Sequence, residues 1–159
     1  RGARVTAIDL SAEVLTVARL HALESGVSVD YREISAEALA DAEPGAYDVV
    51  TCLEMLEHVP DPESVLRACA RLLKPGGTLV ASTINRTPHA FALAIVGAEF
   101  VLGLLPRGTH RYDQFIKPSE LAAALRRAGF ALREVRGLGY DPLLRRARLS
   151  DDTRMNYLV

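Results

Sequence analysis

Short apolar runs alternate along this chain with longer stretches of helical periodicity. Four apolar runs predict strands, at residues 4–9, 27–33, 47–53 and 78–83. Apolar residues spaced three or four positions apart predict helices between these strands, at residues 12–25, 35–42 and 63–73. Because strand and helix alternate with short connections, we expect an α/β fold, with a mostly parallel sheet and helices on both of its faces.

The pattern changes in the second half of the chain. A long apolar segment at residues 90–105 precedes a predicted helix at 118–128, a strand at 130–135 and a last strand at 155–159. Lys74-Pro75-Gly76-Gly77 predicts a tight turn, since glycine and proline supply the backbone angles of turns. No repeat, low-complexity tract or linker separates these elements, so we expect one domain over residues 1–159.

Composition and charge narrow the class of protein. The 159 residues suffice for one domain with a sizeable core, and the net charge of −1 argues against a nucleic-acid binder, which needs a basic excess. Cys52 and Cys69 form no C-x-x-C pair, which indicates two buried free thiols in a reducing compartment. Neither a signal peptide nor a confident membrane span is visible, so we expect a cytoplasmic protein.

The first candidate site residue is Asp9, at the end of the first predicted strand. Ligands of parallel sheets bind beyond the carboxyl ends of the strands. A carboxylate at this place can accept two hydrogen bonds from the hydroxyls of a ribose. It can equally be a charge at a helix N-terminus that complements the helix dipole, and the residue alone does not decide between the two.

A cluster of acidic and imidazole side chains follows Leu53, the last residue of the third predicted strand. If Glu54-Met55-Leu56-Glu57-His58 coils into a helical turn, Glu54, Glu57 and His58 project on one face. Two carboxylates there can hold Mg²⁺, and His58 can be a third ligand or a general base. The alternative is a solvated, charged loop, and the position of the cluster at the ligand-binding edge favours the site.

Polar residues also follow the fourth predicted strand. Ser82, Thr83, Asn85 and Arg86 could line the mouth of a substrate site. Helix capping by Thr83 or Asn85, with Arg86 as a surface residue, explains the same sequence equally well.

The apolar segment at residues 90–105 contains a single charged residue, Glu99. It falls short of the roughly 20 residues needed to span a bilayer. Basic residues flank it, so it fits a helix that lies in the membrane interface with its cations near anionic lipid. The alternative is a helix that covers the core. We favour the membrane location because the segment has more apolar side chains than one face of a sheet can cover.

These segments together resemble class I S-adenosylmethionine methyltransferases and, more narrowly, the ubiquinone biosynthesis O-methyltransferases. The resemblance is carried by residues 8–9, 18–26, 47–62, 74–77, 82–86, 96–99, 108–110, 115–118, 139–142 and 156–157. The Glu54–His58 block is its most specific part. The Lys-Pro-Gly-Gly sequence is shared by many methyltransferases and discriminates little.

The resemblance implies a Rossmann-like, seven-stranded sheet with an antiparallel last strand. It implies that S-adenosylmethionine binds at Asp9 and Leu10, with its adenine near Leu53. It implies Mg²⁺ or another divalent cation at Glu54, Glu57 and His58. For the methyl transfer itself, we expect His58 or His110 to take the acceptor's proton. The acceptor would be a polyprenylated phenol or catechol, reached at the inner membrane surface through the apolar insertion at residues 89–111. A quinone-biosynthesis complex is a further expected partner.

The family's first strand and glycine-rich donor loop should precede Arg1. We therefore expect residues 1–159 to be the larger, carboxyl-terminal part of the enzyme. We also expect this part by itself to bind the donor poorly and to be inactive, because the missing strand would lie beside the strand that ends at Asp9.

Three other functions compete with this interpretation. An NAD(P)-dependent oxidoreductase also has an acid after its second strand, but it does not need the Glu-x-x-Glu-His cluster. A different class I methyltransferase could act on a soluble phenol or on carbon, although the apolar segment favours a lipid-soluble acceptor. The third alternative is a non-catalytic module that binds membranes.

Overall fold

The computed structural model describes residues 2–101, 106, 108–141 and 146–159. Its strands are β1 (Thr6–Asp9), β2 (Asp30–Glu33), β3 (Tyr47–Leu53), β4 (Leu73–Ile84), β5 (Arg136–Asp141), β6 (Arg146–Ser150) and β7 (Asn156–Leu158). Its helices are α1 (Ala12–Glu24), α2 (Ala36–Ala42), α3 (Pro62–Leu72), α4 (Pro88–Ala90) and α5 (Pro118–Arg127). Single 3₁₀ turns form η1 (Leu56–His58) and η3 (Tyr112–Gln114), and a π-helix forms η2 (Phe91–Val101).

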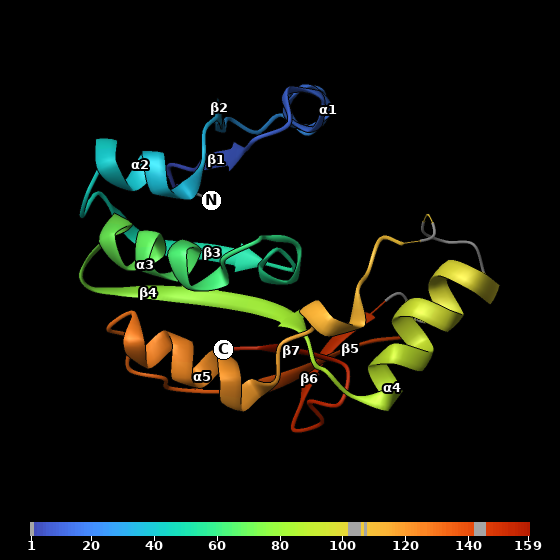
Figure 1. Ribbon diagram of the computed structural model, residues 1–159. Helices are drawn as coiled ribbons and strands as arrows, with labels where there is room; N and C mark the ends of the chain where they lie inside the picture. The colour runs from blue at the N-terminus through green and yellow to red at the C-terminus, as the bar shows by residue number, and fades with distance from the viewer. Residues whose placement is uncertain (1, 102–105, 107, 142–145) are drawn as a thin grey trace.

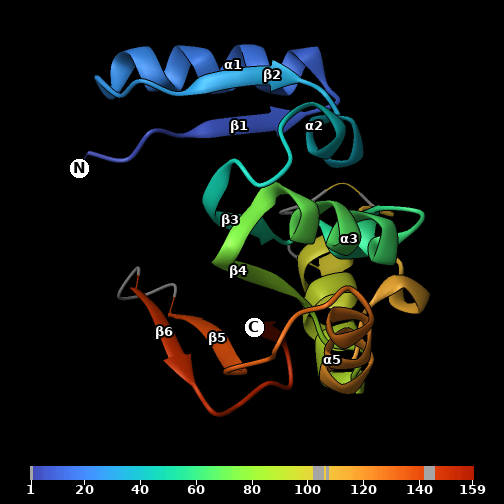
Figure 2. The ribbon, with the colours of Figure 1, turned by 90° about the vertical axis from the view of Figure 1, so that its left-hand side faces the viewer.

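The strands form two sheets (Figures 1 and 2). β1 and β2 pair in parallel, and a second sheet has the order β3-β4-β7-β5-β6. β3 and β4 are parallel, whereas β7 runs antiparallel to both of its neighbours. The predicted α/β fold with an antiparallel last strand is confirmed. The seven strands nevertheless form two sheets and not one, and the pairing is mixed and not mostly parallel, because β5 and β6 add an antiparallel hairpin that the sequence did not indicate.

The helices begin where side chains satisfy their free backbone amides. The Ser11 hydroxyl accepts from Val14 N in α1, the Ser35 hydroxyl accepts from Ala38 N in α2, and Asp61 accepts from Ser64 N in α3. Such N-caps each stabilise a helix by about 1 kcal/mol. The predicted starts of these helices therefore lie within one residue of those observed.

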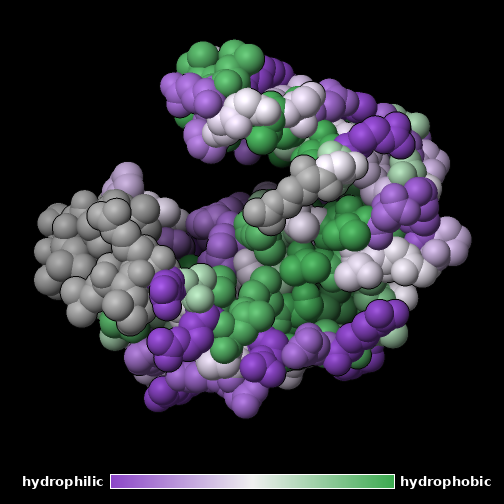
Figure 3. Space-filling view, turned by 180° about the vertical axis from the view of Figure 1, so that it is seen from behind, coloured by the Kyte–Doolittle hydropathy of each residue, from purple (hydrophilic) through white to green (hydrophobic). Residues whose placement is uncertain are grey.

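The main core lies between α3, α5 and one face of β3 and β4. Leu66, Leu121 and Tyr157 are at most 1% exposed there. Val49 and Leu53 alternate with the core residues of β3 and are more than half exposed on the other face of the sheet. Figure 3 shows extensive apolar surface on the side of the molecule opposite to the view of Figure 1.

Two local predictions were inaccurate. The strand predicted at residues 130–135 does not form there, and β5 begins at Arg136. Phe130 and Val135 instead pack on the main core, so their apolar character serves packing rather than strand pairing. The turn predicted at 74–77 lies inside β4 as a bulge, since Tyr47 pairs with Leu73 but Val49 pairs with Thr78.

The two sheets are separated between β1 and β3. Among the described residues, β1 pairs only with β2 and β3 pairs only with β4, so each has one edge without a neighbouring strand. A cavity of about 880 Å³ lies there, lined by residues 2–6 on one side and 46–49 on the other. α2 and α3 bridge the two parts, because Ile8 of β1 packs against the same buried cluster as Val50 of β3.

Candidate active site

Asp9 and Leu10 form the donor-side part of the predicted site, at the end of β1. The Asp9 carboxylate accepts a hydrogen bond from Ser11 N at 2.7 Å, so it shapes the entry into α1. Leu10 is 72% exposed, and Leu53, at the end of β3, is 53% exposed. Among the described residues, no hydrogen bond or ion pair joins Asp9 to the Glu54–His58 segment. Their common role in binding a donor therefore stays a prediction.

Glu54 leaves β3 with an unusual backbone and a carboxylate that accepts one hydrogen bond on each oxygen. Its φ angle is 51°, the only left-handed non-glycine conformation among the described residues. Such a conformation is uncommon outside glycine and is found at sharp turns and functional sites. Its Oε1 accepts from Ser82 Oγ at 2.6 Å and its Oε2 accepts from Asn156 Nδ2 at 2.5 Å. Burial raises the pKa of this carboxyl, and the bond from Ser82 opposes that shift.

Glu57 is the most deeply buried charged residue of the site. It is 2% exposed, and its Oε2 accepts from the buried Thr83 hydroxyl at 2.7 Å. Its Oε1 is buried and has no hydrogen-bond partner among the described residues. An unsatisfied buried oxygen is costly, so this atom needs a further donor or a cation.

Two histidines from distant parts of the chain meet beside these carboxylates. The ring centroids of His58 and His110 are 5.7 Å apart, and the His110 ring also packs on Phe115 at 6.1 Å. His110 and Glu57 both lie close enough to Glu54 to affect its pKa. The charge of Glu57 raises the pKa of the Glu54 carboxyl, and His110 lowers it. The structure thus brings together four of the predicted site residues.

The predicted geometry of the metal ligands needs correction. The 3₁₀ turn η1 begins only at Leu56, and the left-handed backbone at Glu54 turns the chain before it. Glu54, Glu57 and His58 therefore do not lie on one helical face. No group of three or more His, Cys, Asp or Glu side chains within the described part of the chain is arranged to hold a metal ion.

The sequence interpretation missed the partners of the two carboxylates. Ser82 and Thr83 were candidates for a substrate mouth or a cap, but their hydroxyls bind Glu54 and Glu57. Asn156 entered only through the resemblance, and no local signal connects it to Glu54, which lies 102 residues away. The long-range pairing of β7 with β4 creates this contact.

Solved structures share this arrangement of strands and helices. A SAM-dependent methyltransferase from Thermotoga maritima, described as a possible histamine N-methyltransferase, matches 97% of this chain and 70% of its own with a TM-score of 0.68 and 20% identity. A putative methyltransferase from Bacillus halodurans matches 84% of this chain and 55% of its own, with a TM-score of 0.65 and 29% identity. The fold, with polar side chains at the carboxyl ends of β3 and β4, is that of a class I S-adenosylmethionine-dependent methyltransferase.

Sequence comparison identifies the family. Residues 1–81 match the model of the methyltransferase domain family, and the chain belongs to this family. It is 64% identical over 158 residues to the ubiquinone biosynthesis O-methyltransferases of Xanthomonas euvesicatoria and Xanthomonas oryzae. The match covers 99% of this chain and 66% of those proteins, so the chain spans just under two thirds of their length. The resemblance inferred from the sequence is confirmed.

Proposed function

We propose that the protein containing these residues transfers a methyl group from S-adenosylmethionine to a hydroxyl of a polyprenylated phenol or catechol in ubiquinone biosynthesis. The observation that carries this proposal is the 64% identity over 99% of the chain to relatives named for that reaction. The clustering of Glu54, Glu57, His58 and His110 beside one sheet edge supports it, because acceptor chemistry needs a proton acceptor there.

The donor supplies an activated sulfonium methyl, so the protein must align it and make the acceptor oxygen nucleophilic. A free phenol has a pKa of about 10 and is little ionised at neutral pH. His58 or His110 takes the phenolic proton while the methyl group moves from the donor's sulfur to that oxygen, which leaves S-adenosylhomocysteine. Asp9 holds the donor's ribose, and the exposed side chains of Leu10 and Leu53 offer apolar contact to its adenine.

A divalent cation, Mg²⁺ by the chemistry of its oxygen ligands, belongs to the same proposal. The unpartnered buried Oε1 of Glu57 supports it, because a cation would satisfy that atom. Glu54, Glu57 and His58 are the residues that would hold the ion. When bound, it would lower the pKa of a coordinated phenol. Thermal unfolding tests this: Mg²⁺ should raise the midpoint of the wild type but not of Glu57→Gln, and an equal response would contradict it.

The segment at residues 89–111 is proposed to contact the membrane that holds the acceptor. Phe91, Leu93 and Val96 are between 41% and 49% exposed, so this helix can present apolar side chains to a lipid surface. The helix formed by α4 and η2 stands at the edge of the fold, on the side to which β4 points (Figure 1). In the described ranges no helix is both long and apolar enough to cross a bilayer, and residues 102–105 lie outside them. This proposal places the protein peripherally at the cytoplasmic face of the membrane, together with other quinone-biosynthesis enzymes.

Methylation of matched acceptors tests the proposed function. The enzyme, expressed from its complete reading frame, is incubated with labelled donor and either a polyprenylated catechol in lipid vesicles or a catechol without the prenyl chain. We expect a large preference for the prenylated acceptor in kcat/KM. Equal rates would favour the alternative of a methyltransferase for soluble phenols, and no transfer to either acceptor would overturn O-methylation of catechols.

A further inference from the structure

The C-terminal strand β7 reaches into the site through one side chain, Asn156. Its Nδ2 donates to Glu54 Oε2 at 2.5 Å, across 102 residues of sequence. The backbone of Asn156 is fixed on both sides, because it pairs with Ile84 of β4 and with Leu138 of β5. Asn85 N also donates to the neighbouring Met155 carbonyl at 2.7 Å. Because its backbone is held on both sides, the Asn156 side chain has little freedom to follow a moving partner.

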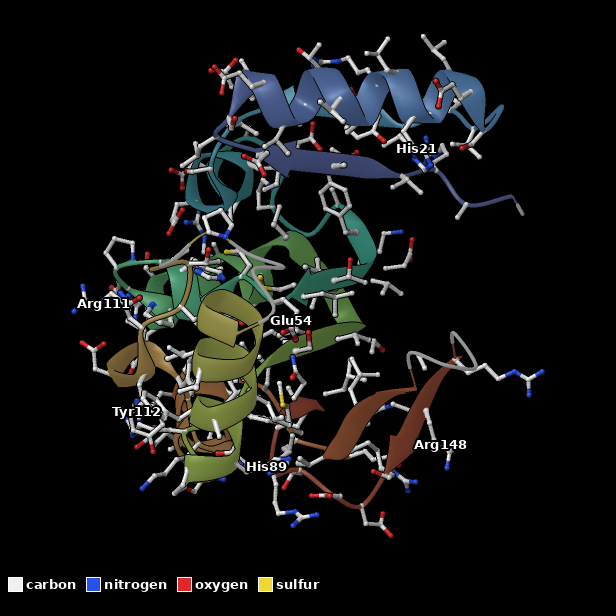
Figure 4. All side chains as sticks on the ribbon, turned by 90° about the vertical axis from the view of Figure 1, so that its right-hand side faces the viewer. His21, Glu54, His89, Arg111, Tyr112 and Arg148 are labelled. Carbon is white, nitrogen blue, oxygen red and sulfur yellow. The ribbon has the colours of Figure 1, made fainter. Side chains whose placement is uncertain are left out.

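Glu54 is held from a second strand as well. Ser82 of β4 donates its hydroxyl to Oε1 at 2.6 Å, and the Ser82 carbonyl and hydroxyl oxygens both lie 3.1 Å from Glu54 N, which donates to them. One donor alone would leave the carboxylate free to rotate about its bond to Ser82. Two donors on its two oxygens, from two different strands, fix the plane of the group. Figure 4 shows Glu54, which directly follows the carboxyl end of β3.

The two contacts leave acceptor capacity unused. Each carboxylate oxygen has two lone pairs, and the described protein donors occupy one on each oxygen. The other lone pairs can accept from an acceptor hydroxyl or coordinate a cation. The left-handed backbone at Glu54, with a φ of 51°, fixes the direction in which the side chain leaves the main chain. The backbone at Glu54 and its two donors therefore set the direction of this carboxylate.

We propose that Asn156 is a positioning residue of the methyl-transfer reaction, which orients the Glu54 carboxylate toward the acceptor. This inference rests on the proposed function, since it assigns Glu54 to the acceptor side of that site. Asn156 itself touches neither substrate nor donor in this role. β7 then contributes to the chemistry in addition to completing the sheet.

The experiment compares Asn156→Ala, Asn156→Asp and a control, Asn85→Ala, each in the enzyme expressed from its complete reading frame. Asn85 suits the control because its Nδ2 ties down the same segment, donating to the Thr153 carbonyl at 2.8 Å, without contacting Glu54. Asn156→Asp keeps the volume but replaces the donor with a second carboxylate. For each variant, kcat, KM for donor and acceptor, and the unfolding midpoint are measured with the polyprenylated catechol.

We expect both Asn156 variants to lose roughly 10- to 100-fold in kcat, the range typical of residues that orient a catalytic side chain. Their KM for S-adenosylmethionine should stay unchanged, and Asn85→Ala should keep its kcat within about twofold while it loses stability. Unchanged kcat in Asn156→Ala overturns the inference. Equal losses of kcat in Asn85→Ala and Asn156→Ala also overturn it, because a general loosening of the segment would then explain both. An inactive wild type would instead refute the proposed function.

Discussion

Replacing Thr83 with valine tests the contact that fixes the buried Glu57. The Thr83 hydroxyl donates to Glu57 Oε2 at 2.7 Å, and the two residues are 0% and 2% exposed. Valine keeps the shape of threonine but leaves both oxygens of the carboxylate without a donor among the described residues. A hydrogen bond to a charged group contributes about 1.5–3 kcal/mol. We expect T83V to lower the free energy of unfolding by that amount.

The loss should be visible in thermal unfolding followed by circular dichroism. For a protein of 150 to 250 residues, about 1 kcal/mol shifts the midpoint by about 2–4 °C, so T83V should melt roughly 3–12 °C lower. T83S is the matched control, because it keeps the hydroxyl and loses only a methyl group, about 0.8 kcal/mol. If T83V melted at or above the midpoint of T83S, the argument that this hydroxyl stabilises a buried carboxylate would be refuted.

Three further outcomes are expected. In isothermal titration, residues 1–159 alone should give no saturable binding of S-adenosylhomocysteine, whereas the enzyme expressed from its complete reading frame should bind it. The reason is that β1 and β3 have free edges where the strand before the donor loop is expected. Tight binding to residues 1–159 would contradict this. Burial raises the pKa of Cys52 from 9.0 to about 12, so the folded state retains a proton that the unfolded state loses. The stability from this group is therefore present below pH 9 and lost as the pH rises toward 12, and the unfolding midpoint should fall less steeply over that range in Cys52→Ala than in the wild type. Leu93→Glu should weaken co-sedimentation with anionic vesicles several-fold, whereas Ala12→Glu, which places the same charge at an exposed position of α1, should not; equal effects would argue against the membrane contact.

The sequence predicted the elements whose signals are local. The helices at residues 12–25, 35–42 and 63–73 and the apolar run of β3 were predicted from neighbouring residues, and these elements appear nearly as predicted. The start of β5 was misplaced because Phe130 and Val135 look like strand residues but pack on the main core. Periodicity cannot distinguish an apolar side chain that faces a helix from one in a strand.

The candidate site was predicted in part for the same reason. Glu54, Glu57 and His58 are close in sequence, so the cluster could be recognised, and the position of β3 placed it at the edge of the sheet. The left-handed backbone at Glu54 has no signature in the residue itself, since glycine or asparagine is the usual occupant of that conformation. The bonds from Ser82, Thr83 and Asn156 depend on strand order, which only the folded chain reveals.

The place of β7 in the sheet also sets the order in which this protein can fold. β7 follows every other described strand along the chain, yet it lies between β4 and β5 and buries Tyr157 completely. The β–α units before it are local and can form while the ribosome is still adding residues, at about 5–20 per second. Closure of the core must wait for β7, so during synthesis the nascent chain presents an unfilled apolar seam to chaperones until that strand emerges.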